Sequence, residues 1–317
     1  MSSTLSCHPL PAGFRLEHYR IEREIAFGGF SKVYLAFDAA GSPVAIKEYL
    51  PLALTQRDAG ESEPRVSEDN RSDFNAGLKC FFEEGRMLSR LVHPHVIRVT
   101  DFFRANGTAY MVMAYERGRT LREHVRRHRG PVPEAFIRDI FLQVLDGLME
   151  VHRNGLLHLD LKPANIFLRS DGTPLLLDFG ATREHIGEQG GAVRLSSIHT
   201  PGYAAPEQVR HAPPAGPWTD LYGVGASLYY CLGGESPPGA KERLEQDTLQ
   251  PAVQRWRSRY SPDLLALIDG CLQLDPAGRP QTAEWLRTAL AAQAGKAPRG
   301  TTMLGKIRGR IGRLLTP

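Results

Sequence analysis

The sequence predicts an α+β fold with two lobes: an N-terminal lobe built on an antiparallel β-sheet with one helix, and a larger, mainly helical C-terminal lobe. Residues 14–50 contain short runs in which apolar and polar positions alternate, separated by turns, as is typical of antiparallel strands. From residue 120 onward, apolar residues recur at helical spacing instead. A chain of 317 residues is long enough for each lobe to bury its own core.

The N-terminal lobe is expected over residues 14–115, after a flexible N-terminus of residues 1–13. An inserted loop is predicted at about residues 51–72, where acidic residues, Pro and Gly are concentrated. The other elements are predicted in this order: strands at residues 19–25, 32–37 and 44–47, a helix at about residues 74–91, and strands at residues 96–103 and 110–115.

The C-terminal lobe is expected over residues 116–292. Pro133-Glu134 opens a long helix that reaches about Arg153, with apolar residues on one face. Asp220 opens a second helix, strongly apolar, that reaches Leu232. Arginines gather at the start of this lobe, and we interpret them as a solvated face that would discourage very basic substrates: Arg117, Arg119, Arg122, Arg126, Arg127 and Arg129.

The composition is that of an ordinary globular protein, with 42% hydrophobic and 23% charged residues. The four cysteines are far apart and form no Cys-x-x-Cys pair, so neither a zinc site nor a disulfide framework is indicated. The first residues lack a signal-peptide pattern, and no apolar run is long enough to cross a bilayer. We therefore expect a cytoplasmic protein with no membrane span.

A basic tail, residues 293–317, accounts for the formal charge of +4. It holds six basic residues and no acid, so the remainder has 33 basic against 35 acidic residues, and no nucleic-acid partner is expected. Its apolar residues recur at helical spacing, which predicts a helix that docks on an acidic partner or an anionic membrane surface. Three glycines equally favour a disordered tail.

One stretch of the sequence contains the candidate catalytic and metal-binding residues. Residues 158–167 read His-Leu-Asp-Leu-Lys-Pro-Ala-Asn-Ile-Phe, and a short apolar strand then leads to Asp178-Phe179-Gly180. Phosphoryl transfer needs a carboxylate to orient the attacking hydroxyl, a cation for the moving phosphoryl group, and oxygen ligands for magnesium. The four candidates for these roles are Asp160, Lys162, Asn165 and Asp178.

Further motifs make the resemblance to protein kinases specific. Val44-Ala45-Ile46-Lys47 follows a glycine-containing hairpin, Thr200–Glu207 ends in Ala-Pro-Glu, and Arg279 is placed to pair with Glu207. Over about residues 14–292 the chain resembles eukaryotic-like serine/threonine protein kinases of the bacterial type. The resemblance implies the bilobal protein-kinase fold, ATP with Mg²⁺ or with Mn²⁺ in its place, and a protein substrate.

It also implies residue roles. Asp160 would orient or deprotonate the substrate hydroxyl, Lys162 would contact the γ-phosphate, and Asn165 and Asp178 would bind the metal. Lys47, paired with Glu84, would reach the α- and β-phosphates from the other side of the family's cleft. The remaining nucleotide contacts would be the hairpin residues Ala26, Phe27, Gly28 and Gly29, the adenine-facing Val33, Ala45 and Phe167, the gatekeeper Met113 and the hinge residue Tyr115. His158 is expected to be structural, in an apolar stack with Leu88, Val99 and Phe179.

The chain departs from the family pattern at a few positions. Ala26 and Ser31 replace two of three hairpin glycines, which would stiffen or lift the loop over the phosphates. Leu159 replaces the arginine that commonly pairs with a phosphorylated activation segment, so activity should depend less on phosphorylation of that loop. Thr120 and Ala164 stand where kinases that prefer basic substrates often have acids, so little preference for basic substrates is expected.

Three functions stay open. The first is an active serine/threonine protein kinase that also phosphorylates itself, since all six groups that handle ATP and metal are present. The second is a pseudokinase that binds nucleotide or a signalling partner without turnover, which the replacements at Ala26, Ser31 and Leu159 would allow. The third is a kinase for small molecules, which shares the catalytic Asp and Asn but lacks the substrate-loop motifs.

Overall fold

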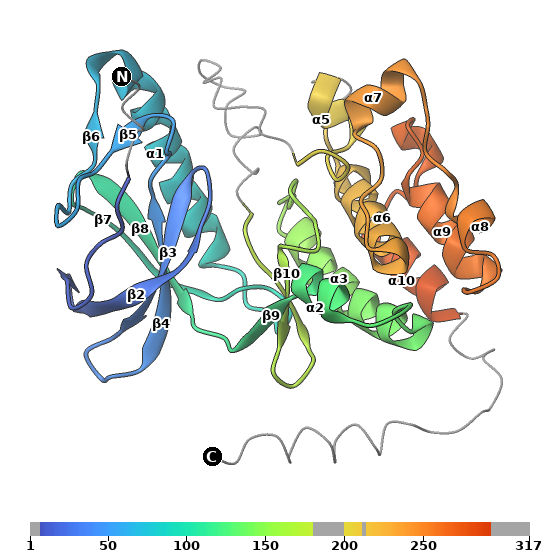
Figure 1. The fold of residues 1–317 in the computed structure, drawn as a ribbon, viewed down its shortest axis with the longest axis horizontal. Coiled ribbons are helices and arrows are strands. Elements are labelled where there is room, and N and C mark those ends of the chain that lie inside the picture. Colours follow the sequence, from blue (N-terminus) through green and yellow to red (C-terminus); the bar gives the residue numbers. More distant parts are fainter. Residues whose placement is uncertain (1–6, 180–199, 211–213, 293–317) are drawn as a thin grey trace.

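The computed structural model describes residues 7–179, 200–210 and 214–292. Figure 1 shows two lobes side by side, the β-sheet with helix α1 in one and the remaining helices in the other. The predicted two-lobe α+β architecture is therefore confirmed. The basic tail lies outside the described residues, as does Gly180. Ser196 and Ser197, two candidate phosphorylation sites in the segment before Thr200, also lie outside them.

The N-terminal lobe is built on a six-stranded sheet in the order β1-β2-β3-β4-β8-β7. Every neighbouring pair of strands runs antiparallel. The strand β1 (Arg15–Leu16) was not predicted. The other five lie within a few residues of their predicted positions, and they are β2 (Tyr19–Phe27), β3 (Ser31–Phe37), β4 (Pro43–Tyr49), β7 (Val99–Ala105) and β8 (Thr108–Ala114).

Both faces of this sheet are buried. Directly paired residues share one face, as do residues two apart along a strand. The inner face, which includes Met111 and Met113, packs toward α1 and the helical lobe in one continuous core. The outer face, which includes Ile46 and Val112, belongs to a separate apolar cluster.

Residues 7–13 complete the cover of the outer face. Leu10 is 2% exposed and belongs to the same cluster as Ile21 and Ile46. Its backbone N–H donates to the Tyr34 hydroxyl at 3.2 Å. The flexible N-terminus predicted up to residue 13 is therefore wrong for residues 7–13, because the apolar outer face of the sheet binds this segment.

The inserted segment also has structure of its own. Two short strands, β5 (Thr55–Gln56) and β6 (Arg65–Val66), pair with each other, and α1 (Glu68–Leu88) begins before the predicted position. The acidic residues Glu68 and Asp69 in its first turn favour a helix start there, since carboxylates stabilise the N-terminal end of a helix. The polar loop expected at residues 51–72 is thus partly strand and partly helix.

A buried network ties the insertion to β4. Arg57 is fully buried and donates to both carboxylate oxygens of Glu48, at 2.6 and 2.8 Å. The hydroxyls of Tyr34 and Tyr110 donate to the same carboxylate at 2.7 and 2.8 Å. A buried charge is stable only when it is paired and hydrogen-bonded, and here both requirements are met. The network therefore fixes the strand that carries the candidate lysine.

The C-terminal lobe is helical around α6, which is buried along almost its whole length. A three-stranded sheet, in the order β11-β10-β9, lies at its junction with the first lobe. The helices and strands are β9 (Gly118–Thr120), α2 (Leu121–Arg127), α3 (Glu134–Arg153), β10 (Ile166–Arg169), β11 (Pro174–Leu176), α5 (Pro206–Arg210), α6 (Pro217–Gly233), α7 (Ala240–Glu245), α8 (Ala252–Arg255), α9 (Pro262–Cys271), the 3₁₀ helix η2 (Pro276–Gly278) and α10 (Ala283–Ala292).

Residues 95–97 connect the lobes. They follow α1, yet they hydrogen-bond to β11 in the second lobe: the N–H of Ile97 donates to the carbonyl of Leu176 at 3.0 Å, and that of Leu176 donates to the carbonyl of His95 at 2.9 Å. Helix α3 approaches closely at Gly147, where a Cβ atom would lie 3.0 Å from the His95 carbonyl oxygen. None of the helices in the described ranges combines the length and the apolar character needed to cross a bilayer.

Candidate active site

The loop that carries Asp160 is held in a strained conformation by the helical lobe. Leu159 has a φ of 58°, a left-handed conformation that costs a non-glycine residue about 1 kcal/mol or more. Its N–H donates to Asp220 Oδ1 at 2.7 Å, and its carbonyl accepts from Gln208 Nε2 at 2.8 Å. The N–H of His158 donates to Asp220 Oδ2 at 2.9 Å. These bonds offset the strain and fix the loop.

Sequence analysis missed this role of Asp220 and Gln208. Asp220 was interpreted only as the start of an apolar helix, and its carboxylate is in fact buried against the loop. The available signal was a charged residue at the head of a helix that is otherwise almost entirely apolar, because a buried carboxylate needs donors nearby.

Asp160 lies at the centre of a polar cluster. Lys162 Nζ donates to both of its carboxylate oxygens, at 3.0 and 2.8 Å, and also to the hydroxyl oxygen of Thr200 at 2.7 Å. Asn165 Nδ2 donates to Asp160 Oδ2 at 3.0 Å and to its carbonyl at 2.9 Å. The structure thus brings together Asp160, Lys162 and Asn165, and adds Thr200 from the segment that precedes α5.

A second polar cluster combines residues of both lobes. Lys47 Nζ lies 2.7 Å from Asp178 Oδ1 and 3.9 Å from Glu84 Oε1. The charge of Lys47 lowers the pKa of Asp178 below its usual value, and the charge of Lys162 contributes in the same direction. Asp178 is therefore ionised at neutral pH. Lys47 on β4, Glu84 on α1 and Asp178 after β11 converge as the sequence motifs predict.

His158 and Phe179 form the apolar floor between these clusters. Their rings are in contact at a tilt of 34° with centroids 4.5 Å apart, and His158 Nε2 lies 3.0 Å from the carbonyl oxygen of Leu177. Both residues are buried, and Leu88 and Val99 are buried in the core that includes Phe179. This arrangement agrees with a structural position for His158.

The residues expected to face adenine share the inner face of the sheet. Val33 pairs directly with Lys47, and Ala45 pairs directly with Met113, so all four lie on one face. Ala45 is buried, whereas Val33 and Met113 are partly exposed. Phe167, the corresponding residue of the second lobe, lies on β10 opposite Thr120. Tyr115 is partly exposed and follows the last residue of β8.

The backbone of the hairpin of residues 26–31 does not require the glycines that it contains. Neither Gly28 nor Gly29 has a positive φ, and a Cβ atom at either would meet nothing within 4 Å. Ala26 is exposed, and Phe27 is 74% exposed with the ammonium of Lys32 5.6 Å from its ring centre. Ala26 and Ser31, which replace two family glycines, also have no positive φ, so the local backbone tolerates both replacements.

The hairpin tip is also tied to the segment after β4, which sequence analysis did not anticipate. The N–H of Leu50 donates to the carbonyl of Phe30 at 2.8 Å, and that of Leu52 donates to the carbonyl of Gly29 at 2.9 Å. Because these bonds join backbone atoms, they do not require particular residue types, and the sequence could not predict them. They hold the hairpin tip against the segment that follows β4.

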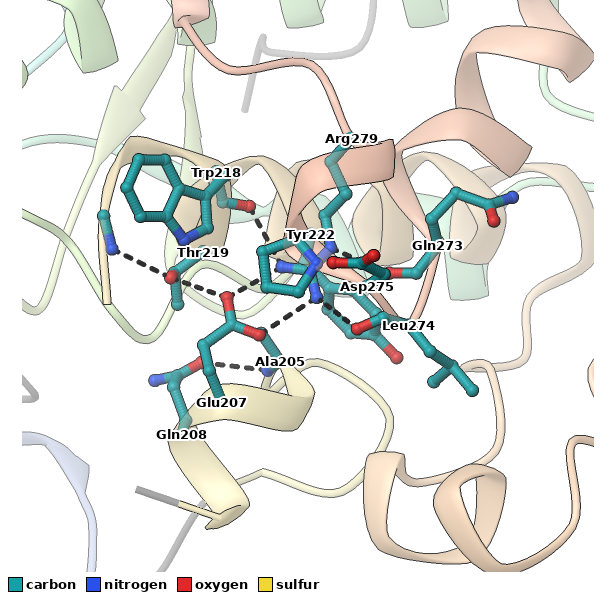
Figure 2. A network of polar contacts seen from close by, with 12 residues as sticks. Ala205, Glu207, Gln208, Trp218, Thr219, Tyr222, Gln273, Leu274, Asp275 and Arg279 are labelled. Atoms are coloured by element: carbon teal, nitrogen blue, oxygen red, sulfur yellow. Dashed lines mark hydrogen bonds and ion pairs between the residues drawn. The ribbon is translucent and has the colours of Figure 1, made fainter. Parts of the chain in front are cut away.

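A buried ion pair anchors the segment that carries Thr200. Glu207 and Arg279 are both fully buried as side chains and form two bonds, at 2.8 and 2.9 Å (Figure 2). Thr219 adds a hydrogen bond to Glu207 at 2.7 Å, and the guanidinium lies 5.0 Å from the centre of the Tyr222 ring. The remaining guanidinium donors reach backbone carbonyls of Gln273, Leu274 and Trp218. The pairing predicted for Glu207 and Arg279 is confirmed.

Asn165 and Asp178 fit a magnesium ion by their chemistry. Both offer side-chain oxygens, the ligands Mg²⁺ prefers, and the Asp178 side chain is half exposed. The Asn165 amide nitrogen is engaged with Asp160, which turns the amide oxygen away from that carboxylate. Among the described residues no group of three or more His, Cys, Asp or Glu could hold a metal, and Mg²⁺ typically takes only one or two carboxylates together with phosphate oxygens.

Comparison with known proteins agrees with this geometry. A family model described as a protein kinase domain matches residues 19–290. The serine/threonine-protein kinase PknL of Mycobacterium tuberculosis is 33% identical over 270 residues, which cover 83% of this chain and 59% of the relative. PknA of Nostoc sp. is 29% identical over 282 residues, which cover 86% of this chain and 46% of the relative. The chain thus spans about half the length of these curated relatives.

Solved structures show the same fold. A structure described as the PpkA-294 apo form has a TM-score of 0.79 and 35% identity, and the alignment covers 89% of this chain and 99% of that one. The kinase domain of PknI from Mycobacterium tuberculosis has a TM-score of 0.68 at 23% identity, covers 91% of this chain and 100% of its own, and shows the fold alone. Since the family model and these relatives match most of the residues, this chain belongs to the protein kinase family, as one of its eukaryotic-like serine/threonine members.

Proposed function

We propose that the protein transfers the γ-phosphoryl group of Mg-ATP to serine and threonine hydroxyls of proteins, its own included. The observation that carries this proposal is the convergence of two polar clusters, Lys47 with Glu84 and Asp178, and Asp160 with Lys162 and Asn165. When bound, Mg-ATP supplies the transferable phosphoryl group and a metal charge that offsets the negative charge of the phosphates.

Asp160 would receive the substrate hydroxyl. Its carboxylate is partly exposed and fixed by Lys162, Asn165 and Thr200, so it can accept the hydroxyl proton and aim the oxygen. Lys162 bridges Asp160 and Thr200 and places a positive charge beside the oxygen that attacks. Fixed charges of this kind stabilise a transition state because they need no reorganisation during the reaction.

Lys47 would position the nucleotide. The lysine is buried and already lies between two carboxylates, so its ammonium is held in place before nucleotide arrives. Asp178 keeps its negative charge beside Lys47 and can turn its exposed carboxylate toward a metal, together with Asn165. Val33, Ala45, Met113 and Phe167 would enclose the base, beside Tyr115.

Autophosphorylation tests the proposal. The wild-type protein, incubated with Mg-ATP, should acquire phosphoserine or phosphothreonine, and EDTA should abolish the reaction because the phosphates need the metal. Lys47→Met should lose most of this activity while it stays folded. Nucleotide binding by the wild type, without phosphorylation of itself or of any added protein, would instead support a pseudokinase. Phosphorylation of a metabolite alone would support a small-molecule kinase.

Activity is expected not to require a phosphorylated activation segment. Leu159 is 6% exposed and packs into the core, where it offers no charge that could pair with a phosphate. Protein produced together with a phosphatase, and shown by mass spectrometry to be unphosphorylated, should phosphorylate a peptide at a constant rate from the first time point. A lag that shortens as enzyme concentration rises would show that the enzyme must first phosphorylate itself, and would contradict the expectation.

A further inference from the structure

A group of arginines lies beside the proposed active site. Arg119 and Arg122 flank the junction of β9 and α2, and this junction is joined to the loop that carries Asp160 and to β10, the strand that follows the loop. The N–H of Arg122 donates to the carbonyl of Pro163 at 2.9 Å, and Arg119 is paired with Leu168 on β10. Pro163 follows Lys162 directly in the sequence. The backbone that carries both arginines is thus fixed close to the residues that would receive the phosphoacceptor.

Neither arginine has an acidic partner in the part of the chain that the structure describes. Arg119 and Arg122 are both exposed, and no ion pair joins either of them to an acid within residues 7–179, 200–210 and 214–292. The acids nearest in sequence are otherwise engaged. Glu116 pairs with Arg169 at 3.0 Å, and Glu123 accepts the N–H of Thr120 at 2.9 Å in a capping box. Further exposed arginines lie in the same stretch of the sequence: Arg117, Arg126, Arg127 and Arg129.

The charge of Arg122 extends to the segment on the opposite side of Asp160. Burial raises the pKa of the Tyr203 hydroxyl, and the positive charge of Arg122 opposes that rise, which places the guanidinium within electrostatic range of Tyr203. Tyr203 follows Thr200, whose hydroxyl bonds to Lys162 and Asp160. Since the backbone of Arg122 bonds to Pro163, the residue after Lys162, a peptide whose hydroxyl reaches Asp160 would lie beside the start of α2.

The chemistry of this surface indicates which substrate side chains it would bind. Guanidinium groups that lack an acidic partner bind carboxylates through paired, charge-assisted hydrogen bonds. They also repel arginine and lysine side chains. The neighbouring side chains Thr120 and Ala164 carry no charge that would counteract this preference.

We propose that Arg119 and Arg122 select protein substrates with acidic residues next to the phosphorylated serine or threonine. This inference rests on the proposed kinase function and adds the class of substrate. The arginines act as specificity residues: they contact the flanking side chains of the substrate, while Asp160 and Lys162 act on its hydroxyl.

Peptides that differ only in their flanking residues test the inference. Three versions of one serine peptide carry aspartate, alanine or arginine around the acceptor, and kcat/KM is measured for each with the wild-type chain. The aspartate peptide should exceed the alanine peptide by about three- to tenfold, and the arginine peptide should be the poorest, in line with one or two ion pairs at exposed sites. Equal values for the three peptides, or the highest value for the arginine peptide, would overturn the inference.

Charge reversal then identifies the residues. In the double variant Arg119→Glu with Arg122→Glu, the ratio of aspartate to arginine peptide should invert, and Arg122→Lys should retain the original order. Because this ratio compares two peptides with the same variant, a general loss of activity does not change it. Arg257→Glu, between α8 and α9, reverses the charge of one exposed arginine elsewhere and should leave the ratio unchanged.

Different results would contradict the substrate preference and the kinase function. An enzyme that phosphorylates the peptides without discrimination, or whose preference survives the reversal of both arginines, contradicts the substrate inference and leaves the kinase function standing. A chain that binds Mg-ATP but phosphorylates neither the peptides nor itself contradicts the kinase function.

Discussion

Asp160→Asn should abolish most phosphoryl transfer while nucleotide binding is retained. The substitution keeps the shape of the side chain but removes the charge that accepts hydrogen bonds from Lys162 and Asn165. An amide is also too weak a base to take the hydroxyl proton. Loss of a positioned general base reduces kcat by about 10²- to 10⁴-fold. Steady-state kinetics with a peptide substrate, beside titration of a fluorescent nucleotide, would separate the two effects.

Asp171→Asn is the matched control for that experiment. Asp171 is an exposed aspartate in the turn between β10 and β11, where its carboxylate accepts from the N–H and hydroxyl of Thr173. The same chemical change there should leave kcat unaffected. A variant at Asp160 that keeps the wild-type kcat would show that this carboxylate does not act on the substrate.

Arg279→Leu should lower the free energy of unfolding by about 3–5 kcal/mol, because it leaves Glu207 as a buried, unpaired charge. The effect should be large since the guanidinium also binds the carbonyls of Gln273 and Leu274 (Figure 2). Urea denaturation followed by tryptophan fluorescence would measure it. Activity should fall in the same variant, because the pair anchors the segment that carries Thr200.

Two further variants separate charge from shape at this ion pair. Arg279→Lys keeps the positive charge but not the planar fork, so its loss of stability should be intermediate. Combining Arg279→Leu with Glu207→Gln removes the stranded charge and should recover part of the stability. If the double variant were destabilised by the sum of the two single effects, the ion pair would not be the source of the loss.

The elements that the sequence predicted well are those with a strong local pattern. The alternation of apolar residues located the strands of the sheet, and the helix from Glu134 to Arg153 was found at its actual bounds. The candidate catalytic residues could be proposed from the sequence because phosphoryl transfer requires particular residue types at a fixed spacing. Lys47 and Glu84 lie far apart in the chain, and the sequence motif around each residue was enough to predict that their side chains meet.

The features that the sequence did not reveal depend on tertiary contacts. The N-terminal segment lacks a pattern of its own, and it is ordered because the outer face of the sheet buries Leu10. Arg57 appeared to be one charged residue in a polar loop, but it is buried against Glu48. The contact of Asp220 with the backbone of His158 and Leu159 likewise requires knowledge of where α6 lies.

The central claim is that this chain transfers phosphate to protein hydroxyls, and the identity of the phosphorylated residue tests it most directly. The wild-type protein, freed of phosphate and then incubated with Mg-ATP, should be digested and its phosphorylated residues identified by mass spectrometry. We expect phosphoserine and phosphothreonine in the wild type and neither in Asp160→Asn treated identically. An unmodified wild-type chain that nevertheless binds Mg-ATP, with no phosphate transferred to an added protein, would contradict the account.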